Sequence, residues 1–127
     1  MDKKSINSDS APAPLGGYEQ AIEVSGTTRR LYISGQIPMC HLGAVPETFQ
    51  AQAELVWDNI KAQLREASMT LNNLVKVTIY LSDRKHCMEN RAVRERVMVG
   101  QSIASTVIIA DIFSEEWLLE IEGIAEA

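Results

Sequence analysis

Residues 74–83, which read LVKVTIYLSD, decide the fold class of this chain. Apolar residues alternate with polar ones through the stretch, and a period of two is typical of a β-strand with one buried face. The apolar residues that share one face are Val75, Val77, Ile79 and Leu81. The stretch therefore predicts a sheet that the rest of the chain covers on one side.

Residues 49–67, just before this strand, predict an amphipathic helix. Apolar residues recur there at spacings of three and four, with polar residues between them, which is the pattern of one helix face. These residues are Ala53, Val56, Trp57, Ile60, Leu64 and Ala67. Glu47 and Thr48 stand near the start, where the first N–H groups of a helix need a cap.

A second helix is expected after the strand, from Asp83 as its cap to about Met98, with Gly100 ending it. Its apolar stripe is expected to include Met88, Ala92 and Val99. Its charged face carries Arg84, Arg91, Arg94 and Glu95. We interpret the arginines on this face as solvated.

The N-terminal part of the chain predicts an irregular arm followed by a hairpin. Two prolines and a Gly-Gly pair interrupt residues 1–17, which are expected to be irregular. Residues 18–24 and 31–33 flank the turn-forming segment 25–28, which is the pattern of a β-hairpin.

Two further strands are expected toward the C-terminus. Residues 105–110 are apolar on both faces after Thr106, as in an interior strand, and residues 116–125 alternate as a last strand. The order hairpin, helix, strand, helix, strand, strand predicts an α+β fold. We expect one domain spanning residues 1–127, with two helices on one face of a mixed sheet.

Such a sheet leaves its second face bare, although its strands carry apolar side chains in both directions. Val107, Ile108 and Leu118 are examples of apolar residues that cannot all point toward the helices. A chain of 127 residues has nothing left to cover this face. We therefore expect a homo-oligomer that packs sheet against sheet.

The composition argues against a binder of nucleic acid or of anionic membranes. The chain carries 12 basic and 17 acidic residues, a formal charge of −5, whereas such partners attract basic surfaces. No apolar run approaches the roughly 20 residues of a membrane span. The N-terminus lacks the apolar core of a signal peptide, so a cytoplasmic protein is expected.

The sequence carries no metal-binding or catalytic signature. Two neighbouring pairs, Cys40-His41 and His86-Cys87, hold four candidate zinc ligands, but adjacent residues on an extended segment point to opposite faces. We expect reduced thiols, surface or capping histidines and no metal. Phosphate-binding loops, dinucleotide fingerprints and nucleophile elbows are absent. The pair Arg29-Arg30, with no aromatic residues interleaved, is interpreted as solvated rather than as an RNA contact.

Several segments in a fixed order resemble the RidA (reactive intermediate/imine deaminase, YjgF) family. Residues 16–20 resemble that family's G-P-Y-x-Q opening, and residues 34–38 read SGQIP, identical to its S-G-Q-I-P segment. Residues 74–83 match its middle stretch, as do Gln52-Ala53 and Asn59-Ile60, and residues 120–125 resemble its closing signature. The resemblance runs from about Asn7 to Ala125.

The resemblance implies a chorismate-mutase-like α+β fold and a homotrimer with its sheets inward. It also implies small-molecule clefts between neighbouring subunits. The activity it implies is hydrolysis of reactive enamines or imines to a carbonyl product and ammonia, without a metal or an organic cofactor. Other members of the family carry the labels translation inhibitor and endoribonuclease.

Site residues are implied by the resemblance position by position. Glu120 matches the glutamate that positions a water molecule in the family, and Tyr18 and Ser34 match residues that line the cleft. Ser105 and Val107 stand where deaminase members have the arginine of P-A-R-S and a following cysteine. Without the resemblance, Glu120 is interpreted equally well as a surface glutamate, Tyr18 as a packed aromatic residue and Ser34 as a turn serine.

The serine at position 105 is the main departure from the family. An arginine holds a carboxylate through two charge-assisted hydrogen bonds, whereas a serine offers one neutral bond. The loss costs on the order of 1.5–3 kcal/mol of substrate binding, so we expect weak activity on simple 2-imino acids. Four arginines are candidates for a substitute cation, and the sequence places none of them in the cleft: Arg29, Arg30, Arg91 and Arg94.

Three functions stay open at this point. The first is a deaminase acting on an imine or enamine, and the second is a non-catalytic small-molecule-binding or regulatory trimer. The third, an endoribonuclease or translation inhibitor, is disfavoured because each chain would add a charge of −5 to the trimer.

Overall fold

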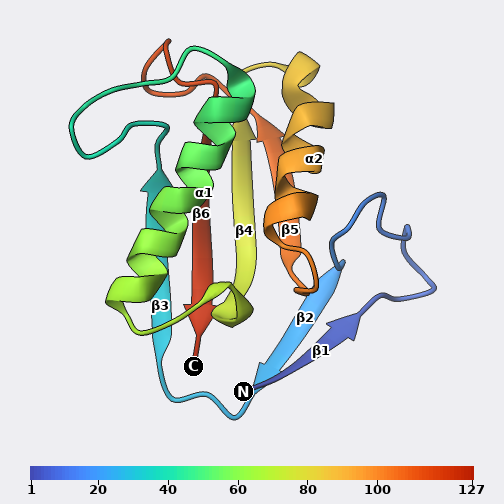
Figure 1. Ribbon diagram of the computed structural model, residues 1–127. Coiled ribbons are helices and arrows are strands. Elements are labelled where there is room, and N and C mark those ends of the chain that lie inside the picture. Colours follow the sequence, from blue (N-terminus) through green and yellow to red (C-terminus); the bar gives the residue numbers. More distant parts are fainter.

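Two helices cover one face of a four-stranded mixed sheet (Figure 1). The computed structural model describes residues 1–127, and the order of strands in this sheet is β3-β6-β4-β5. These strands are β3 (Arg30–Gln36), β6 (Leu119–Glu126), β4 (Leu74–Leu81) and β5 (Ala104–Ile109). The helices are α1 (Phe49–Glu66) and α2 (Cys87–Val97), with short 3₁₀ turns at Leu71–Asn73 and Arg84–His86. The expected α+β class is confirmed.

Strand β4 lies at the centre of the packing and confirms the alternation in its sequence. It pairs antiparallel with β6 and parallel with β5. Val77, Ile79 and Leu81 are fully buried beneath the helices, while Lys76, Thr78 and Tyr80 lie on the other face. Burying one such aliphatic side chain stabilises the fold by about 1.5–3 kcal/mol, so the alternation fixes which face receives the helices.

Helix α1 supplies most of the cover. Its apolar stripe is buried as expected, with Val56 and Ile60 fully inaccessible and Trp57 only 1% exposed. Thr48 is the N-cap, and its side chain accepts a hydrogen bond from the backbone N–H of Ala51. The helix therefore begins and ends within one residue of the expected span.

Helix α2 faces the sheet with a different side from the one expected. Met88 and Val99 are 70% and 76% exposed, whereas Asn90, Val93 and Arg94 are buried. The expected stripe is wrong because the face that packs on the core consists of residues 90, 93, 94 and 97, where polar Asn90 and Arg94 interrupt the apolar pattern. Asp83 caps the short 3₁₀ turn at Arg84–His86, and α2 begins after that turn at Cys87.

The expected N-terminal hairpin is also wrong. Strand β2 (Ala21–Ser25) pairs with β1 (Asp2–Ile6) in a separate two-stranded sheet, and β3 pairs with β6 instead. Residues 2–6 are therefore a strand and only the rest of the expected arm is irregular. The turn signal at 25–28 is real, but Thr28 and Arg29 donate to the carbonyl of Ala127 and lead the chain to β6.

Strand β5 is an edge strand of the sheet, not an interior one. Val107 and Ile108 are 40% and 43% exposed at this edge. Its start is joined to the N-terminal segment by one bridge, Glu19 to Ala104, and by the N–H of Glu19 donating to Ile103 at 2.8 Å. The apolar character of β5 therefore reflects a surface that this chain alone leaves open.

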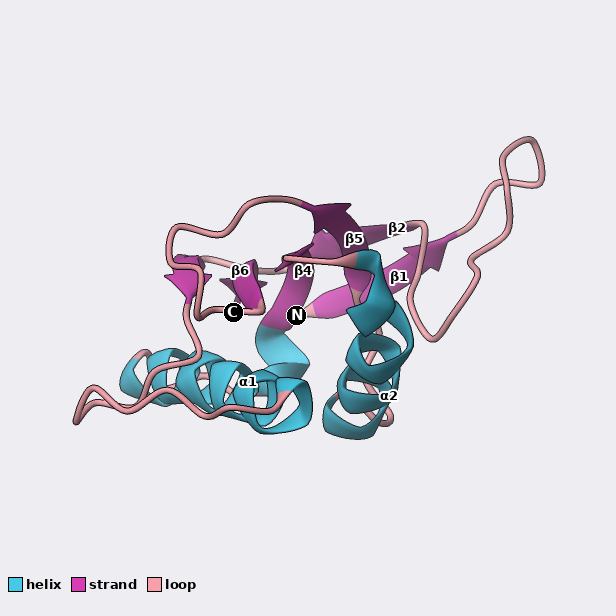
Figure 2. Ribbon diagram, turned by 90° about the horizontal axis from the view of Figure 1, so that it is seen from above, coloured by secondary structure: helices cyan, strands magenta, loops and turns pink.

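The view from above shows both helices on the same side of the sheet (Figure 2). We call the opposite side the open face, and its side chains include Lys76, Thr78, Tyr80, Glu120 and Glu122. Neither helix is both long and apolar enough to cross a membrane.

Gln52 ties two separate loops to α1 and gives a first testable prediction. Its side-chain amide donates to the carbonyls of Pro46 and Glu116 at 2.9 Å, and its oxygen accepts the N–H of Leu118 at 2.8 Å. Gln52→Met keeps the volume but leaves three polar groups unpaired, so it should lower the free energy of unfolding by about 2–4 kcal/mol. Denaturant unfolding measures this loss.

The matched control is Gln50→Met on the exposed side of the same helix. Gln50 contacts only Glu54 one turn away, so its replacement should change stability by less than about 0.5 kcal/mol. Equal losses in the two variants would contradict the assigned role of Gln52.

Candidate functional site

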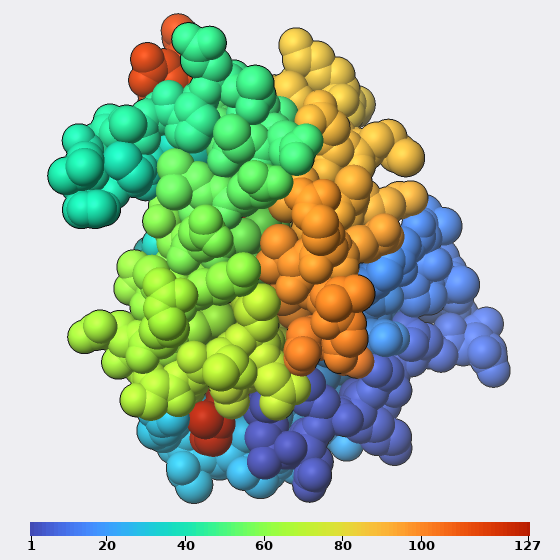
Figure 3. All heavy atoms as spheres, viewed as in Figure 1, coloured from blue at the N-terminus to red at the C-terminus, as the bar shows by residue number.

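A cavity of about 390 Å³ lies between α2, the edge strand β5 and the segment at residues 15–20. We call it the α2 pocket. In the space-filling view, the blue N-terminal segment packs directly against the orange surface of α2 (Figure 3). The pocket is lined by Leu15, Tyr18, Gln20, Cys87, Asn90, Arg91, Arg94, Ser105, Thr106 and Val107.

Three of the residues expected at the site meet in this pocket. Tyr18 enters from the N-terminal segment, and Ser105 and Val107 enter from β5. Successive strand residues point to opposite faces, so the pair at positions 105 and 107 shares the side of the sheet that faces α2. The hydroxyl of Ser105 is buried and has no hydrogen-bond partner in the protein.

Two arginines of α2 also line the α2 pocket. Arg94, expected to be solvated, is only 3% exposed, and the Tyr18 ring lies over its guanidinium at 5.5 Å. Burial lowers the pKa of Arg94, and the charge of Arg91 acts in the same direction while Glu95 opposes it. The sequence predicts that both arginines lie on a helix, but only the structure shows that they lie on the side of α2 that faces the pocket.

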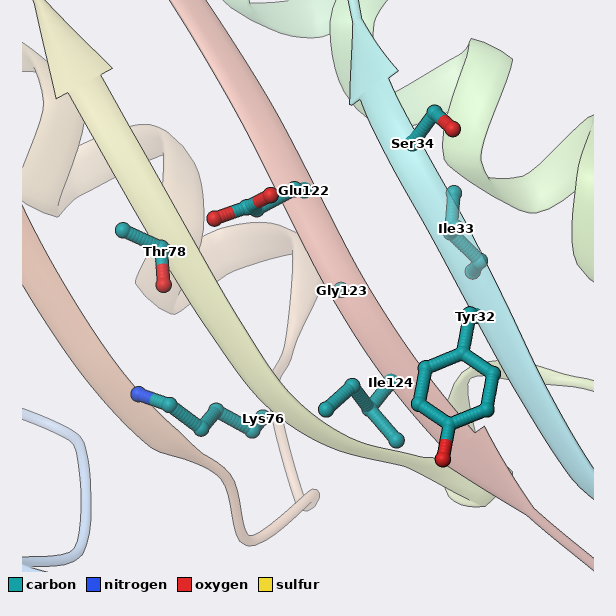
Figure 4. A pocket seen from close by; sticks show the side chains of 8 residues that line it. All are labelled: Tyr32, Ile33, Ser34, Lys76, Thr78, Glu122, Gly123 and Ile124. Carbon is teal, nitrogen blue, oxygen red and sulfur yellow. The ribbon is translucent and has the colours of Figure 1, made fainter.

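Ser34 and Glu120 lie elsewhere, on or beside the open face. A second hollow of about 350 Å³ crosses β3, β6 and β4, and Ser34, Thr78 and Glu122 line it (Figure 4). In the close-up, Glu122 lies between Ser34 on one neighbouring strand and Thr78 on the other. Glu122 accepts a hydrogen bond from the Tyr80 hydroxyl at 2.7 Å, which raises the pKa of Tyr80.

Glu120 is held against a β-bulge. The register between β3 and β6 shifts between Ile33 and Gln36, so Gly35 sits in the irregular part of β3. A Cβ atom at Gly35 would come within 2.7 Å of Cδ of Glu120 and would overlap its carboxylate oxygen. The glycine of the SGQIP segment therefore provides the space that the Glu120 side chain occupies.

The surroundings of Glu120 raise the pKa of its carboxyl group. Burial raises its pKa above the ordinary value, and the negative charge of Glu122 adds to the increase. A base is most effective when its pKa approaches the working pH, so this shift suits general acid–base work. Glu122 contributes to this increase in pKa and Gly35 lies against the carboxylate, and the sequence alone assigned a role to neither residue.

The two groups of residues cannot meet within one chain. Val77, the partner of Ser105 in the register of β4 and β5, points into the core beneath the helices. Tyr80, the partner of Glu120 in the register of β4 and β6, lies on the open face. The α2 pocket and Glu120 therefore belong to opposite sides of the sheet.

No three His, Cys, Asp or Glu side chains cluster in a way that could hold a metal ion. His86, expected at the surface or as a cap, is instead buried and stacks on Phe49 with ring centroids 4.6 Å apart. It precedes α2 but makes no side-chain capping bond. Its burial follows from the 3₁₀ turn, which directs it toward the start of α1.

Comparison with known proteins identifies the family. The model of the family described as Endoribonuclease L-PSP matches residues 8–127. A RutC family protein of Pyrococcus abyssi is 33% identical over 132 residues, which cover 98% of each chain. The chain belongs to the RidA/YjgF superfamily.

Solved structures of this superfamily share the fold. A protein of the conserved Rid family, YyfB from Yersinia pestis, superposes with a TM-score of 0.86 at 25% identity, over 100% of both chains. Escherichia coli TdcF, solved with bound serine, superposes with a TM-score of 0.74 at 26% identity over 98% of both chains. The expected RidA-like fold is confirmed.

The raised pKa of Glu120 predicts a specific dependence of stability on pH. A carboxyl group whose folded pKa exceeds its unfolded pKa stabilises the fold below the unfolded value, about 4.3, and loses that contribution as pH rises through the folded value. Glu120→Gln removes a half-buried charge, so the variant should unfold at a slightly higher temperature than the wild type at pH 7.5. At pH 4 the two should unfold at similar temperatures. Thermal unfolding at the two pH values measures the difference.

Exposed Glu115 supplies the control, since Glu115→Gln should leave the pH dependence as in the wild type. A Glu120→Gln variant that is less stable than the wild type at pH 7.5 would show that the carboxylate is favourably paired.

Proposed function

We propose that this protein hydrolyses a reactive imine or enamine to a carbonyl compound and ammonia. The observation that carries the proposal is Glu120, a desolvated carboxyl group at the Gly35 bulge of the open face. Bulges are frequent beside active sites, where they direct a side chain. A relative supports the reaction class: a candidate reactive intermediate deaminase, TdcF of Escherichia coli, is 33% identical over 82 residues.

The reaction needs one water molecule and no redox partner. Glu120 orients the water and accepts its proton while the oxygen bonds to the C=N carbon, whose π electrons move to nitrogen. The proton held by Glu120 then passes to the nitrogen of the tetrahedral intermediate. Glu120 then takes the hydroxyl proton of this intermediate and delivers it to the nitrogen as the C–N bond breaks. The products are a carbonyl compound and ammonia, and Glu120 is again ionised. An enamine enters the same sequence after protonation on carbon.

The complete site requires two copies of the chain. One copy contributes Tyr18, Ser105 and Val107 from its α2 pocket, and a neighbour contributes Ser34 and Glu120 from its open face. We propose a homotrimer with its sheets inward, because three open faces meeting at a common axis leave a cleft at each boundary. The small-molecule substrate would bind in that cleft, and the reaction as written uses no metal or organic cofactor.

The two other functions of the family are weaker proposals for this chain. RNA would have to approach a chain of charge −5 beside the carboxylates of Glu120 and Glu122, which repel a polyanion. A binding protein without catalysis would use the same cleft, as the serine bound to TdcF illustrates for that protein. The assay below separates catalysis from binding.

The test is ammonia release from an imine generated in situ from serine by a pyridoxal-phosphate dehydratase. The wild type should accelerate the release, and Glu120→Gln should reduce its contribution about 100-fold or more, the usual weight of a positioned acid–base group. Gly35→Ala should act similarly because its methyl group displaces the Glu120 carboxylate. The double variant should lose no more than either single one.

The exposed Glu115→Gln variant serves as the control and should keep full activity. Gly35 does not have a positive φ, so the alanine substitution acts on Glu120 and not on the backbone. No acceleration by the wild type, or full activity in Glu120→Gln, would contradict the proposed function. Binding of serine without ammonia release would favour the regulatory alternative.

A further inference from the structure

A guanidinium group is buried in the α2 pocket without a hydrogen-bonded counter-ion. Nε and Nη2 of Arg94 are inaccessible and have no hydrogen-bond partner in the protein. A nearby carboxylate, that of Glu95, has Oε1 4.0 Å from Nη2, beyond hydrogen-bonding distance, and its side chain is 47% exposed. A buried charge with no hydrogen-bonded partner is costly, so an anionic ligand that hydrogen-bonds to this guanidinium would be stabilised by it.

Further polar atoms in the pocket are also left without partners. The hydroxyl of Ser105 and the side-chain oxygen of Asn90 are buried and unpaired, on the two walls formed by β5 and α2. A hydroxyl can donate to a carboxylate, and an amide oxygen can accept from an ammonium or imine nitrogen. The pocket therefore presents unpaired groups that a small zwitterion-like or anionic ligand would satisfy.

A second cation lies beside the first. The nearest atoms to a Cβ built at Gly16 are Nε of Arg91 at 3.2 Å and Nη2 of Arg94 at 3.3 Å. Both arginines thus converge on the Gly16 backbone, and the Tyr18 ring holds Arg94 through a cation–π contact at 5.5 Å. Two adjacent positive charges repel each other unless an anion lies between or beside them.

We propose that Arg94, assisted by Arg91 and Ser105, is the carboxylate-binding group of the α2 pocket. The cation is the guanidinium of Arg94 on α2. Because Ser105 on β5 has a short side chain, there is space in the pocket for a ligand beside this guanidinium. The pocket volume of about 390 Å³ and the apolar walls formed by Leu15 and Val107 suit a small carboxylic acid with a short carbon chain. A guanidinium fork matches the two oxygens of a carboxylate.

This inference deepens the proposed function and rests on it where it names the substrate. The substrate of the proposed reaction is then expected to carry a carboxylate, because Arg94 supplies a cation that Ser105 of β5 does not. Carboxylate binding by Arg94 would then compensate for the weak activity on simple 2-imino acids that a serine at position 105 leads us to expect. The binding of a carboxylate by Arg94 stands or fails independently of catalysis.

Calorimetric titration of the full-length protein with pyruvate, the product of the simplest such substrate, tests the proposal. Pyruvate should bind to the wild type, and its uncharged amide, pyruvamide, should bind at least tenfold more weakly. Arg94→Met should weaken pyruvate binding roughly ten- to a hundredfold, since it removes a charge-assisted pair. Inorganic phosphate, used as a second anion, should bind more weakly than pyruvate.

The matched control is Arg96→Met on the same helix. Arg96 is 55% exposed and pairs with Glu54 at 3.0 Å, outside the pocket, so its replacement should leave pyruvate binding unchanged. Arg94→Met should unfold, without ligand, at the same temperature as the wild type or a higher one, because methionine removes an unpaired buried charge. An arginine with a purely structural role would instead make this variant less stable.

The proposal is overturned if the wild type does not bind pyruvate, or if Arg94→Met binds it as tightly as the wild type does. It is also overturned if phosphate binds more tightly than pyruvate. Arg94-dependent pyruvate binding without ammonia release would uphold the anion site and contradict the proposed deaminase. If Arg94→Met still releases ammonia and binds pyruvate as the wild type does, the proposed deaminase activity is upheld. The carboxylate-binding role of Arg94 is then contradicted.

Discussion

The one-sided packing of β4 and β6 determines how the rest of the molecule is arranged. Along β4, Val77, Ile79 and Leu81 are buried beneath α1 and α2, and Leu119 and Ile121 of β6 are buried with them. The residues between them carry hydroxyl, ammonium and carboxyl groups, which the same alternation places on the open face. A shift of either strand by one residue would exchange the two faces, so the core and the carboxylates are fixed by one register.

This arrangement divides the chemistry between two sides of the sheet. Glu120 stands on the open face, where the Gly35 bulge makes room for it, whereas Arg94 lies among the helix-side residues beside Ser105. The proposed base and the proposed anion-binding group lie on opposite sides of one sheet, so they can serve the same substrate only when a second copy presents the missing half. The exposed apolar residues of β5 are consistent with an edge that a neighbour covers.

Sequence periodicity predicted the elements whose burial is local and regular. The span of α1 and the buried face of β4 were predictable because each pattern persists over several residues. The pairing of β2 with β1 was not, because residues 2–6 have no alternating pattern and their partner lies across an irregular segment. The buried face of α2 was not predictable because polar Asn90 and Arg94 stand on it, and the burial of His86 depends on its contact with Phe49 of α1.

The candidate site was predictable only in part for the same reason. Tyr18, Ser105 and Val107 line one pocket, and the family resemblance says nothing of the arginine on α2 that lines it with them. Gly35 was visible in the SGQIP segment, yet its role depends on a bulge that appears only when β3 and β6 are paired. Contacts between elements, rather than patterns within them, supply the missing residues.

The central claim is that each site combines the α2 pocket of one copy with the open face of another. Subunit mixing tests it most directly: Glu120→Gln chains are unfolded and refolded together with Ser105→Phe chains, whose pocket the phenyl ring fills. Each variant alone should be inactive, and an equal mixture should recover about a quarter of the wild-type rate of ammonia release, because random assembly pairs two intact halves at that frequency. A mixture no more active than its two components would contradict the claim.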